Sequence, residues 1–280
     1  MIKAIKNIYT QIIWVISRKI FLDIRSDSPS LNLDTSEKNI INYFLENYNK
    51  KNKILFDVGA NVGAWSKLVL EKDKDISLFA FEATHKTYIN LKEILNKHNG
   101  RNINISNQAL SNEMGDFNMY NFGENEGINS FFKNQVAYKN SQNIEPKIEK
   151  VSTTTIDMFC EENNIQAIDY LKCDTEGNDF NVILGAKDMF KDEKIVAFQF
   201  EYNWRWINSG TSLKNIFDYF RDTNYIVGKI TKNEIQFIRI WNPELEKFYE
   251  ANYLIVHNKH LRNFKHNFYY FNRRNVLQIA

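Results

Sequence analysis

The chain has 280 residues, 43% of them hydrophobic and 25% charged, and its formal net charge is +2. A chain with this apolar fraction can form a hydrophobic core, which excludes wholesale disorder. Its nearly balanced charge gives no sign of a concentrated basic face, so we do not expect a nucleic-acid partner. Cys160 and Cys173 lack spaced Cys or His partners that would indicate a zinc site, so we expect reduced, buried thiols in a cytoplasmic protein.

The N-terminal stretch, residues 1–24, predicts a helix. Its apolar residues recur at roughly helical spacing, and they are Ile5, Ile8, Ile12, Ile13, Val15, Ile16 and Ile20. Arg18 and Lys19 interrupt the stretch, so we expect neither a transmembrane helix nor a signal peptide. The favoured interpretation is a helix that packs on the domain or on a second subunit of a homo-oligomer. The alternative is a basic amphipathic helix, residues 1–22, that rests peripherally on the inner face of a membrane.

Strands and helices alternate along the following part of the chain. After a capped helix within 34–52, the apolar patterns predict a strand at 54–58, a helix at 64–72, a strand at 77–82, a helix at 85–98 and a strand at 102–107. Beyond these they predict a strand at 117–122, a loop at 123–135, a strand and helix within 151–164, a strand at 169–174, one helix at 179–190, a strand at 194–202, a helix at 212–225, and closing strands at 226–230, 234–240 and 253–257.

This alternation indicates an α/β fold with a mainly parallel sheet, helices on both of its faces, and antiparallel closing strands. We divide the chain into an N-terminal helical segment at 1–50, one domain at 51–258, and a basic, aromatic C-terminal tail at 259–280. A structural arm is the favoured role of that tail.

The first predicted strand runs into a glycine turn, Asp57-Val58-Gly59-Ala60-Asn61-Val62-Gly63. Gly59 permits a sharp turn at the strand end, and Gly63 lets the next helix approach a ligand closely. A dinucleotide fingerprint has a third glycine and aims a helix at a pyrophosphate, which the carboxylate of Asp57 would repel. The same carboxylate can bind an ammonium group. The turn therefore favours S-adenosyl-L-methionine, which carries an ammonium group and no phosphate, over NAD.

Glu82 ends the second predicted strand. A carboxylate there can accept hydrogen bonds from both ribose hydroxyls of a nucleoside. Because NAD and S-adenosylmethionine share this ribose, Glu82 supports a nucleoside site without distinguishing the two cofactors. Taken alone, Glu82 could equally be a solvated strand end; taken with Asp57 and the two glycines, it predicts a cofactor site.

Five motifs lie in order along the chain: FDVGANVGAWS, FAFEATHKTYINLK, NQALSNEMGD, STTTIDMF and DYLKCDTEGNDFNVILGA. Together they resemble the FkbM family of S-adenosylmethionine-dependent methyltransferases, over about residues 54–205. The resemblance implies a class I methyltransferase fold, which is a Rossmann-like three-layer sandwich, and methyl transfer to a hydroxyl of a sugar or natural product. It also implies a set of cofactor-binding residues: Asp57, Gly59, Asn61 and Gly63 in the first motif, Glu82 as the ribose acid, and Asn107, Gln108 and Ala109 beside the adenine.

Three carboxylates, Asp174, Glu176 and Asp179, surround the end of the strand at 169–174. The resemblance implies that Asp174 lies near the transferring methyl, where it could orient and partly deprotonate an acceptor hydroxyl. Alternatively, Asp174, Glu176 and Glu201 could hold a divalent cation that acidifies the hydroxyl. We favour the metal-free role. For Glu176 and Asp179, a structural role at the start of the next helix is the alternative.

The segment EYNWRWINSG, residues 201–210, is a candidate acceptor pocket. Asn203 and Arg205 could bond hydroxyls or a phosphate, while Trp204 and Trp206 could stack on the face of a sugar. The alternative is an aromatic cluster that packs against the edge of the sheet.

These inferences predict an O-methyltransferase of polysaccharide biosynthesis that uses S-adenosyl-L-methionine. The expected acceptor is a sugar or cell-surface glycan, supplied as a glycan, a nucleotide-sugar or a lipid-linked sugar. One alternative is another acceptor, such as a lipid-linked intermediate or a natural product, and a second is an inactive cofactor-binding partner protein. A nicotinamide-dependent oxidoreductase is disfavoured by Asp57 and by the missing third glycine.

Overall fold

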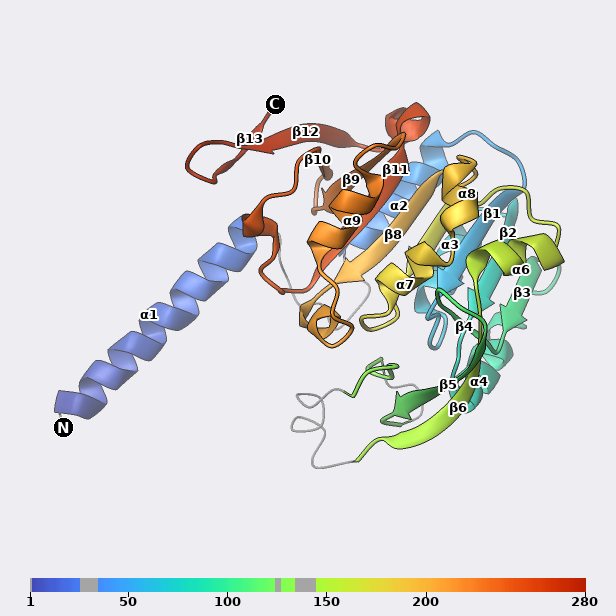
Figure 1. Ribbon diagram of the computed structural model, residues 1–280, viewed down its shortest axis with the longest axis horizontal. Helices are drawn as coiled ribbons and strands as arrows, with labels where there is room; N and C mark the ends of the chain where they lie inside the picture. The colour runs from blue at the N-terminus through green and yellow to red at the C-terminus, as the bar shows by residue number, and fades with distance from the viewer. Residues whose placement is uncertain (1, 26–34, 124–126, 134–144) are drawn as a thin grey trace.

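The structure is a computed structural model, and it describes residues 2–25, 35–123, 127–133 and 145–280. A ten-stranded sheet runs through the body of the molecule, with the strand order β13-β12-β10-β9-β11-β8-β7-β1-β2-β3 (Figure 1). A second sheet has three strands in the order β4-β6-β5.

The middle of the large sheet is parallel. Its successive pairs join β3 (Asn102–Ser106), β2 (Ile76–Phe81), β1 (Lys53–Val58), β7 (Tyr170–Cys173) and β8 (Ala197–Tyr202). Antiparallel pairs then join β8 to β11 (Ala251–His257), β11 to β9 (Tyr225–Ile230), and β9 to β10 (Ile235–Ile238). The parallel strands at the centre are short apolar runs, as expected where helices cover a sheet on each side.

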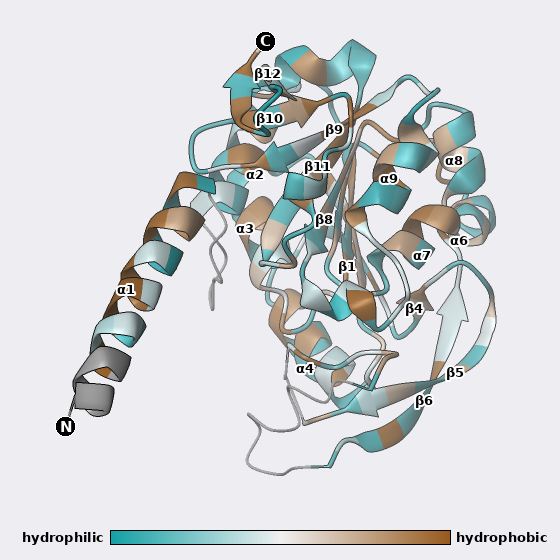
Figure 2. Ribbon diagram, turned by 60° about the vertical axis from the view of Figure 1, so that its left-hand side comes forward, coloured by the Kyte–Doolittle hydropathy of each residue, from teal (hydrophilic) through white to brown (hydrophobic). Residues whose placement is uncertain are grey.

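Helices cover both faces of this sheet and make three layers (Figures 1 and 2). On one face the apolar core contains residues of α2 (Thr35–Asn47), α3 (Ala64–Lys72) and α4 (His85–Leu95). On the other face it contains residues of α6 (Ile156–Glu162), α7 (Asp179–Leu184), α8 (Lys187–Lys191) and α9 (Leu213–Phe220). The predicted α/β three-layer fold, with a mainly parallel sheet and antiparallel closing strands, is therefore confirmed.

The second sheet lies beside this framework and is tied to it. It consists of β4 (Ala109–Leu110), β5 (Gly115–Asn121) and β6 (Lys147–Thr154). The side-chain amide of Asn178 donates a hydrogen bond to the carbonyl of Leu110 over 3.1 Å, and this bond connects β4 to the turn before α7. Part of the predicted loop at 123–135 lies outside the described residues.

The sequence predicted one helix at 179–190, and this is wrong: α7 and α8 are separate. The break falls at Gly185, where a Cβ atom would lie 2.0 Å from the carbonyl oxygen of Ser111. The backbone that follows β4 approaches the helix so closely there that only glycine fits. Cys160 and Cys173 are free and buried, as predicted.

Residues 259–280 extend the large sheet. After η3 (Asn258–Asn263), β12 (His266–Phe271) pairs in parallel with β10, and β13 (Leu277–Ile279) pairs antiparallel with β12. Residues 259–280, which the sequence division treated as a tail, thus add two strands to one edge of the large sheet. At the other end of the chain, α2 buries Ile40, Ile41 and Phe44 against the same sheet.

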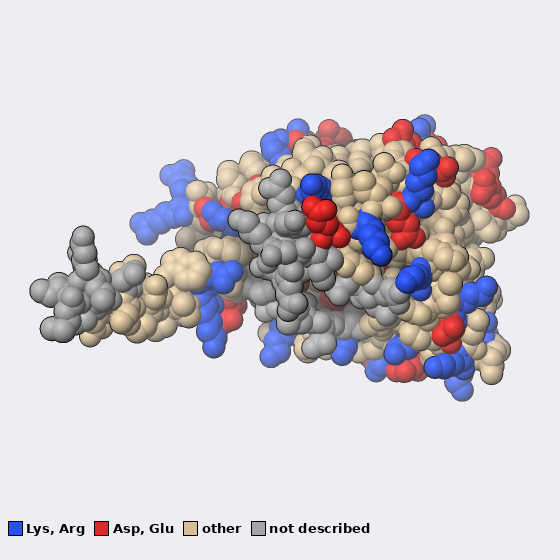
Figure 3. Space-filling model, turned by 90° about the horizontal axis from the view of Figure 1, so that it is seen from below, with Lys and Arg blue, Asp and Glu red and all other residues tan. Residues whose placement is uncertain are grey.

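The first helix, α1 (Ile2–Arg25), extends away from the body (Figures 1 and 2). Across the described ranges, no helix is both long and apolar enough to cross a membrane. Basic and acidic side chains intermingle over the surface of the body when it is seen from below (Figure 3).

The turn after β1 depends on a glycine with no room for a side chain. Gly59 has a φ of 77°, and a Cβ there would lie 2.0 Å from the carbonyl oxygen of Asp174. The turn therefore packs directly on the end of β7, and this contact brings residues from β1 and β7 to one site.

We predict that Gly59→Ala lowers the free energy of unfolding by about 2–4 kcal/mol, because it combines a left-handed backbone with a clash against fixed backbone. Gly100→Ala is the matched control: Gly100 has a φ of 76°, but a Cβ added there would meet no atom within 4 Å. The control should lose only about 1 kcal/mol. Urea denaturation of both variants measures the difference, and equal losses would show that the close approach is not needed.

Candidate functional site

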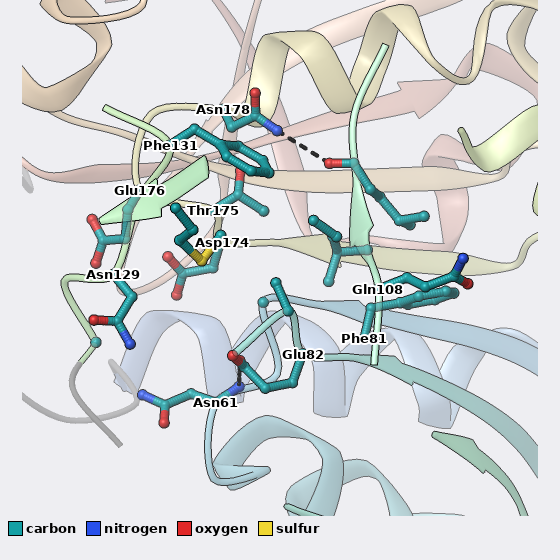
Figure 4. Close-up of a pocket in the computed structure, with 17 residues that line it drawn as sticks. Asn61, Phe81, Glu82, Gln108, Asn129, Phe131, Asp174, Thr175, Glu176 and Asn178 are labelled. Carbon is teal, nitrogen blue, oxygen red and sulfur yellow. Dashed lines mark hydrogen bonds between the residues drawn. The ribbon is translucent and has the colours of Figure 1, made fainter. Parts of the chain in front are cut away.

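A cavity lies at the carboxyl ends of β1, β2 and β7 (Figure 4). In α/β sheets, ligands bind at this edge. The lining residues come from the strand ends, the second sheet and the segment 127–131, and they are Val58, Gly59, Asn61, Phe81, Glu82, Ala83, Gln108, Ala109, Leu110, Met119, Gly127, Asn129, Phe131, Asp174, Thr175, Glu176 and Asn178.

Glu82 is held rigidly at the wall of this cavity. Its Oε1 accepts hydrogen bonds from the amide and hydroxyl of Thr84, at 2.9 and 2.6 Å, and its Oε2 accepts one from the amide of Asn61 at 3.1 Å. Burial raises the pKa of Glu82, and these hydrogen bonds oppose that rise. Two carboxylate oxygens have about four acceptor positions, so Glu82 keeps capacity for a further donor from the cavity.

Asn61 lies beside Glu82 in the glycine turn (Figure 4). Its φ of 48° is left-handed, a conformation that asparagine adopts more readily than most residues. Its side-chain Oδ1 is buried and has no hydrogen-bond partner within the described chain. An unpaired buried acceptor that lines a cavity is placed to receive a hydrogen bond from a ligand.

Asp57 is buried under α3 and does not line the cavity. Its Oδ2 accepts a hydrogen bond of 2.6 Å from the hydroxyl of Ser66, while its Oδ1 has no hydrogen-bond partner in the described part of the structure. Burial raises the pKa of Asp57, against the opposing effects of the Lys172 ammonium and the Ser66 hydroxyl. Gly63, at the start of α3, packs against Leu91 of α4 instead of lining the cavity.

Lys172 is a buried cation beside Asp57 on the neighbouring strand. Its Nζ lies 2.9 Å from Oδ2 of Asp174, which lines the cavity and remains 37% exposed at its side chain. Burial by itself lowers the pKa of Lys172, but the carboxylates of Asp174, Glu37 and Asp57 outweigh burial and raise it. Lys172 therefore stays charged and orients one oxygen of Asp174.

A second ion pair lies beside the cavity, between Arg205 and the cavity-lining residue Glu176. Arg205 Nη1 lies 2.7 Å from Oε2 of Glu176, and both side chains are largely buried. Burial raises the pKa of Glu176 and of Glu201 well above the usual range, and Arg205 opposes the rise at both. Because Arg205 contacts Glu176 directly, Glu201 is the carboxyl more favoured to hold a proton. The side-chain amide of Asn203 donates a hydrogen bond to Oε2 of Glu201 over 2.5 Å.

Several predicted acceptor residues lie outside the cavity lining. Asn203 is buried and caps the short helix η1 (Trp204–Ile207) by accepting from the amide of Arg205. Trp206 is fully buried, donates to the carbonyl of Glu201, and packs on Phe200, so its predicted stacking on a sugar is wrong and the alternative of sheet packing is right. Trp204 is partly exposed, with the guanidinium of Arg205 5.2 Å from its ring centroid.

The three residues predicted beside the adenine divide into two groups. Gln108 and Ala109 line the cavity. The amide of Asn107 instead donates to the carbonyls of Glu82 and Ala83, both at 2.9 Å, and so fixes the chain just after β2.

For a metal, the described residues include no cluster of three or more His, Cys, Asp or Glu side chains suited to hold an ion. Asp174 and Glu176, the ligands in the alternative with a divalent cation, each form an ion pair with a basic side chain.

Two functional residues were missed from the sequence. Thr84 holds Glu82, and a threonine two residues after a strand-end acid offers no pattern that would reveal this role. Lys172 did leave a signal, because a lysine within the apolar run DYLKCD needs a buried carboxylate partner. The lining residues of the segment 127–131 come together only through folding.

Comparison with protein families gives one clear match. A family model described as "Methyltransferase FkbM domain" matches residues 57–227, which include both the glycine turn and the strand end at Asp174. No curated protein matches the chain.

Several solved structures resemble the chain in fold, at low sequence identity. The METTL16 methyltransferase domain is 9% identical, with a TM-score of 0.45, and the match covers 77% of this chain and 63% of that one. TrmK of M. capricolum, in complex with S-adenosyl-homocysteine, is 14% identical, with a TM-score of 0.37 and coverage of 77% and 67%. Precorrin-6y C5,15-methyltransferase from Geobacter metallireducens is 10% identical, with a TM-score of 0.42 and coverage of 84% and 95%. The chain thus spans less than two thirds of the METTL16 structure.

The buried carboxyl of Asp179 predicts how stability depends on pH. Burial and the nearby Asp174 raise the pKa of Asp179 to about 7, although the Thr175 hydroxyl donates to it. The folded protein therefore binds this proton more tightly than the unfolded chain does. The stability from Asp179 is fully present below about pH 4 and is lost as the pH rises through about 7.

Asp179→Asn removes this ionisation, so we expect the variant to gain about 2–4 kcal/mol relative to wild type between pH 4 and pH 8. Urea denaturation at several pH values measures the gain. The control is Asp222→Asn, the same change at an exposed position, which should leave the pH profile unchanged. A constant difference between Asp179→Asn and wild type at every pH would contradict the assignment.

Proposed function

The chain belongs to the FkbM family of S-adenosylmethionine-dependent methyltransferases, and from this premise we propose that it transfers a methyl group to a hydroxyl of a sugar or cell-surface glycan. The observation that carries the proposal is the arrangement of one cavity. A ribose-type carboxylate, Glu82, and a partly exposed carboxylate, Asp174, lie at its wall at the ends of two parallel strands (Figure 4).

The residues of the cavity fit the cofactor. Glu82 has remaining acceptor capacity for one ribose hydroxyl, and the unpaired Oδ1 of Asn61 can accept a hydrogen bond from a hydroxyl or an ammonium group. Gly59 lets the turn pack directly on the end of β7, which brings the ends of β1 and β7 to one cavity. Apolar groups of Phe81, Leu110 and nearby residues offer a surface for the adenine. The carboxylate of Asp57 acts from behind the turn, where its negative charge favours a cationic ligand.

When bound, S-adenosylmethionine supplies an electrophilic methyl group on a sulfonium, which is a good leaving group. The protein then has to align the acceptor oxygen and keep water away. Asp174 can accept a hydrogen bond from the acceptor hydroxyl and receive its proton, because Lys172 engages only one of its oxygens. Met119 lines the cavity from β5 of the second sheet, and Phe131 lines it from the segment 127–131. Both side chains are apolar and help to exclude water.

The acceptor is proposed as a sugar because its hydroxyls match the polar groups around Asp174. Asn129 and Thr175 line the same cavity. The Thr175 hydroxyl donates to Asp179 and can still accept a hydrogen bond, and the amide of Asn129 has a second N–H that can donate to a hydroxyl of the ring. Arg205 lies behind Glu176, so a contact with substrate requires a change in their ion pair. A nucleotide-sugar or a lipid-linked sugar presents the same hydroxyls. The alternatives to this proposal are methyl transfer to another natural product and an inactive protein that only binds the cofactor.

Cofactor binding can be tested at Glu82. We expect Glu82→Gln to raise the dissociation constant for S-adenosylmethionine by about 10- to 100-fold, because a hydrogen bond to a charged group contributes about 1.5–3 kcal/mol. Isothermal titration measures this, with Glu71→Gln on the exposed side of α3 as the matched control. If wild type binds NAD and not S-adenosylmethionine, the cofactor assignment is wrong.

Catalysis can be tested separately at Asp174. In Asp174→Asn the amide oxygen would turn to Lys172 and leave an NH₂ donor toward the cavity, so the acceptor hydroxyl loses its base. We expect methyl transfer to fall by about 100-fold or more while affinity for the cofactor changes little. Asp222→Asn is the control for the change of charge. Unchanged turnover in Asp174→Asn would exclude this role, and absence of turnover in wild type would favour an inactive partner protein.

The acceptor itself is tested with methyl-labelled cofactor and an extract of cell-envelope glycans. Mass spectrometry should find label on a sugar hydroxyl of a glycan, nucleotide-sugar or lipid-linked sugar. Repeating the reaction with added chelator tests the alternative of a divalent cation at Asp174 and Glu176. Label in protein or RNA would rule out the glycan assignment while leaving the methyltransferase assignment intact.

A further inference from the structure

The helix α1 exposes a continuous apolar strip. The strip consists of Ile8, Tyr9, Ile12, Ile13, Ile16 and Ile20, and each of these residues is at least half exposed. Their spacing of three and four residues places them on one side of the helix. Exposed apolar side chains are common singly, but a contiguous strip of this kind indicates a surface that is covered in the working protein.

The opposite side of α1 is the one that contacts the body. The ring of Phe21 lies 6.0 Å from that of Tyr249, and the guanidinium of Arg18 lies 5.7 Å from the same ring. The ammonium of Lys229 donates to the carbonyl of Arg25 over 2.6 Å. Residues 18, 21 and 25 follow a helical spacing of three and four, so they form one line along the helix.

At 100° per residue, this contacting line lies on the side of the helix opposite the line of Ile8, Ile12 and Ile16. The strip therefore points away from the body, and the contacts at the end of α1 hold it in that direction. Both ribbon views show α1 standing apart from the body over most of its length (Figures 1 and 2). Packing of this strip on the body, which the sequence favoured, is not what the structure shows.

The charge of α1 selects the kind of surface that fits the strip. The helix sequence has five basic residues and one acidic residue, Asp23. Such a helix is attracted to anionic lipid headgroups and repelled by a second copy of itself. At 100° per residue the six strip residues span about 140° of the helix circumference, which is wider than the narrow seam of a coiled coil. Thr10 and Ser17 lie on the other side of the helix, away from the strip.

We propose that α1 docks in the plane of an anionic membrane surface, with its isoleucine strip in the boundary between headgroups and acyl chains. The strip supplies the apolar area and the basic residues supply the attraction to the surface, the two contributions on which interfacial helices depend. The body is then held at the membrane through the contacts of Arg18, Phe21 and Arg25. This inference goes beyond the proposed reaction and does not depend on the acceptor.

The test is sedimentation of the full chain with vesicles of phosphatidylglycerol and phosphatidylcholine, compared with vesicles of phosphatidylcholine alone. We expect binding to the anionic vesicles that weakens at high salt. Ile12→Asn with Ile16→Asn should weaken that binding by about tenfold or more, because buried apolar area drives insertion. The matched control is Ile148→Asn with Ile240→Asn, two exposed isoleucines of the body, which should bind like wild type.

Lys19→Glu is a second variant that keeps all six strip residues and reverses one charge beside them, and it should weaken binding to the anionic vesicles and remove its dependence on salt. Thermal unfolding of each variant should match wild type, since the strip points away from the body. Equal binding of the strip variant and wild type would overturn the proposal. So would a wild-type dimer in light scattering that becomes a monomer in the strip variant without any vesicle binding, because the strip would then join two copies of the chain.

Discussion

The charge of Lys172 is the constraint on which the site depends. It is buried in β7 and faces carboxylates from three different parts of the chain: Asp57 on β1, Asp174 after β7, and Glu37 on α2. Removing one partner of a buried ion pair costs about 3–5 kcal/mol, so these groups can share a core only around a cation. The backbone contact between Gly59 and Asp174 closes the same arrangement from the other side. The glycine turn that contains Gly59 and the candidate base Asp174 are therefore packed against each other.

The walls of the cavity are fixed before any ligand arrives. Thr84 and Asn61 hold both oxygens of Glu82, and Lys172 holds one oxygen of Asp174. A preorganised polar site needs little rearrangement when a ligand binds, which is an advantage in a reaction that depends on alignment. The membrane proposal concerns a different part of the molecule. The contacts of α1 with Tyr249 and Lys229 connect that helix to the body without involving the cavity.

The local pattern of apolar residues was enough to predict the parallel strands at the centre of the sheet. The apolar runs around 54–58, 77–82 and 169–174 became β1, β2 and β7 within a residue or two, because a buried strand needs an uninterrupted apolar stretch. The split between α7 and α8 and the pairing of β12 with β10 could not be read in the same way. Both depend on what approaches from elsewhere, namely the backbone of Ser111 and the edge of a distant strand.

By itself, the sequence determined the family, the α/β class and the strand ends that carry Glu82 and Asp174, because motif order and strand periodicity are local properties of the chain. Only the tertiary structure decided which polar residues share the cavity. It turned Asp57 and Gly63 away from the cavity lining, buried Trp206, and paired Glu176 with Arg205. The direction of a side chain and the partner of a charge depend on packing between segments far apart in the chain, and no local pattern records that packing.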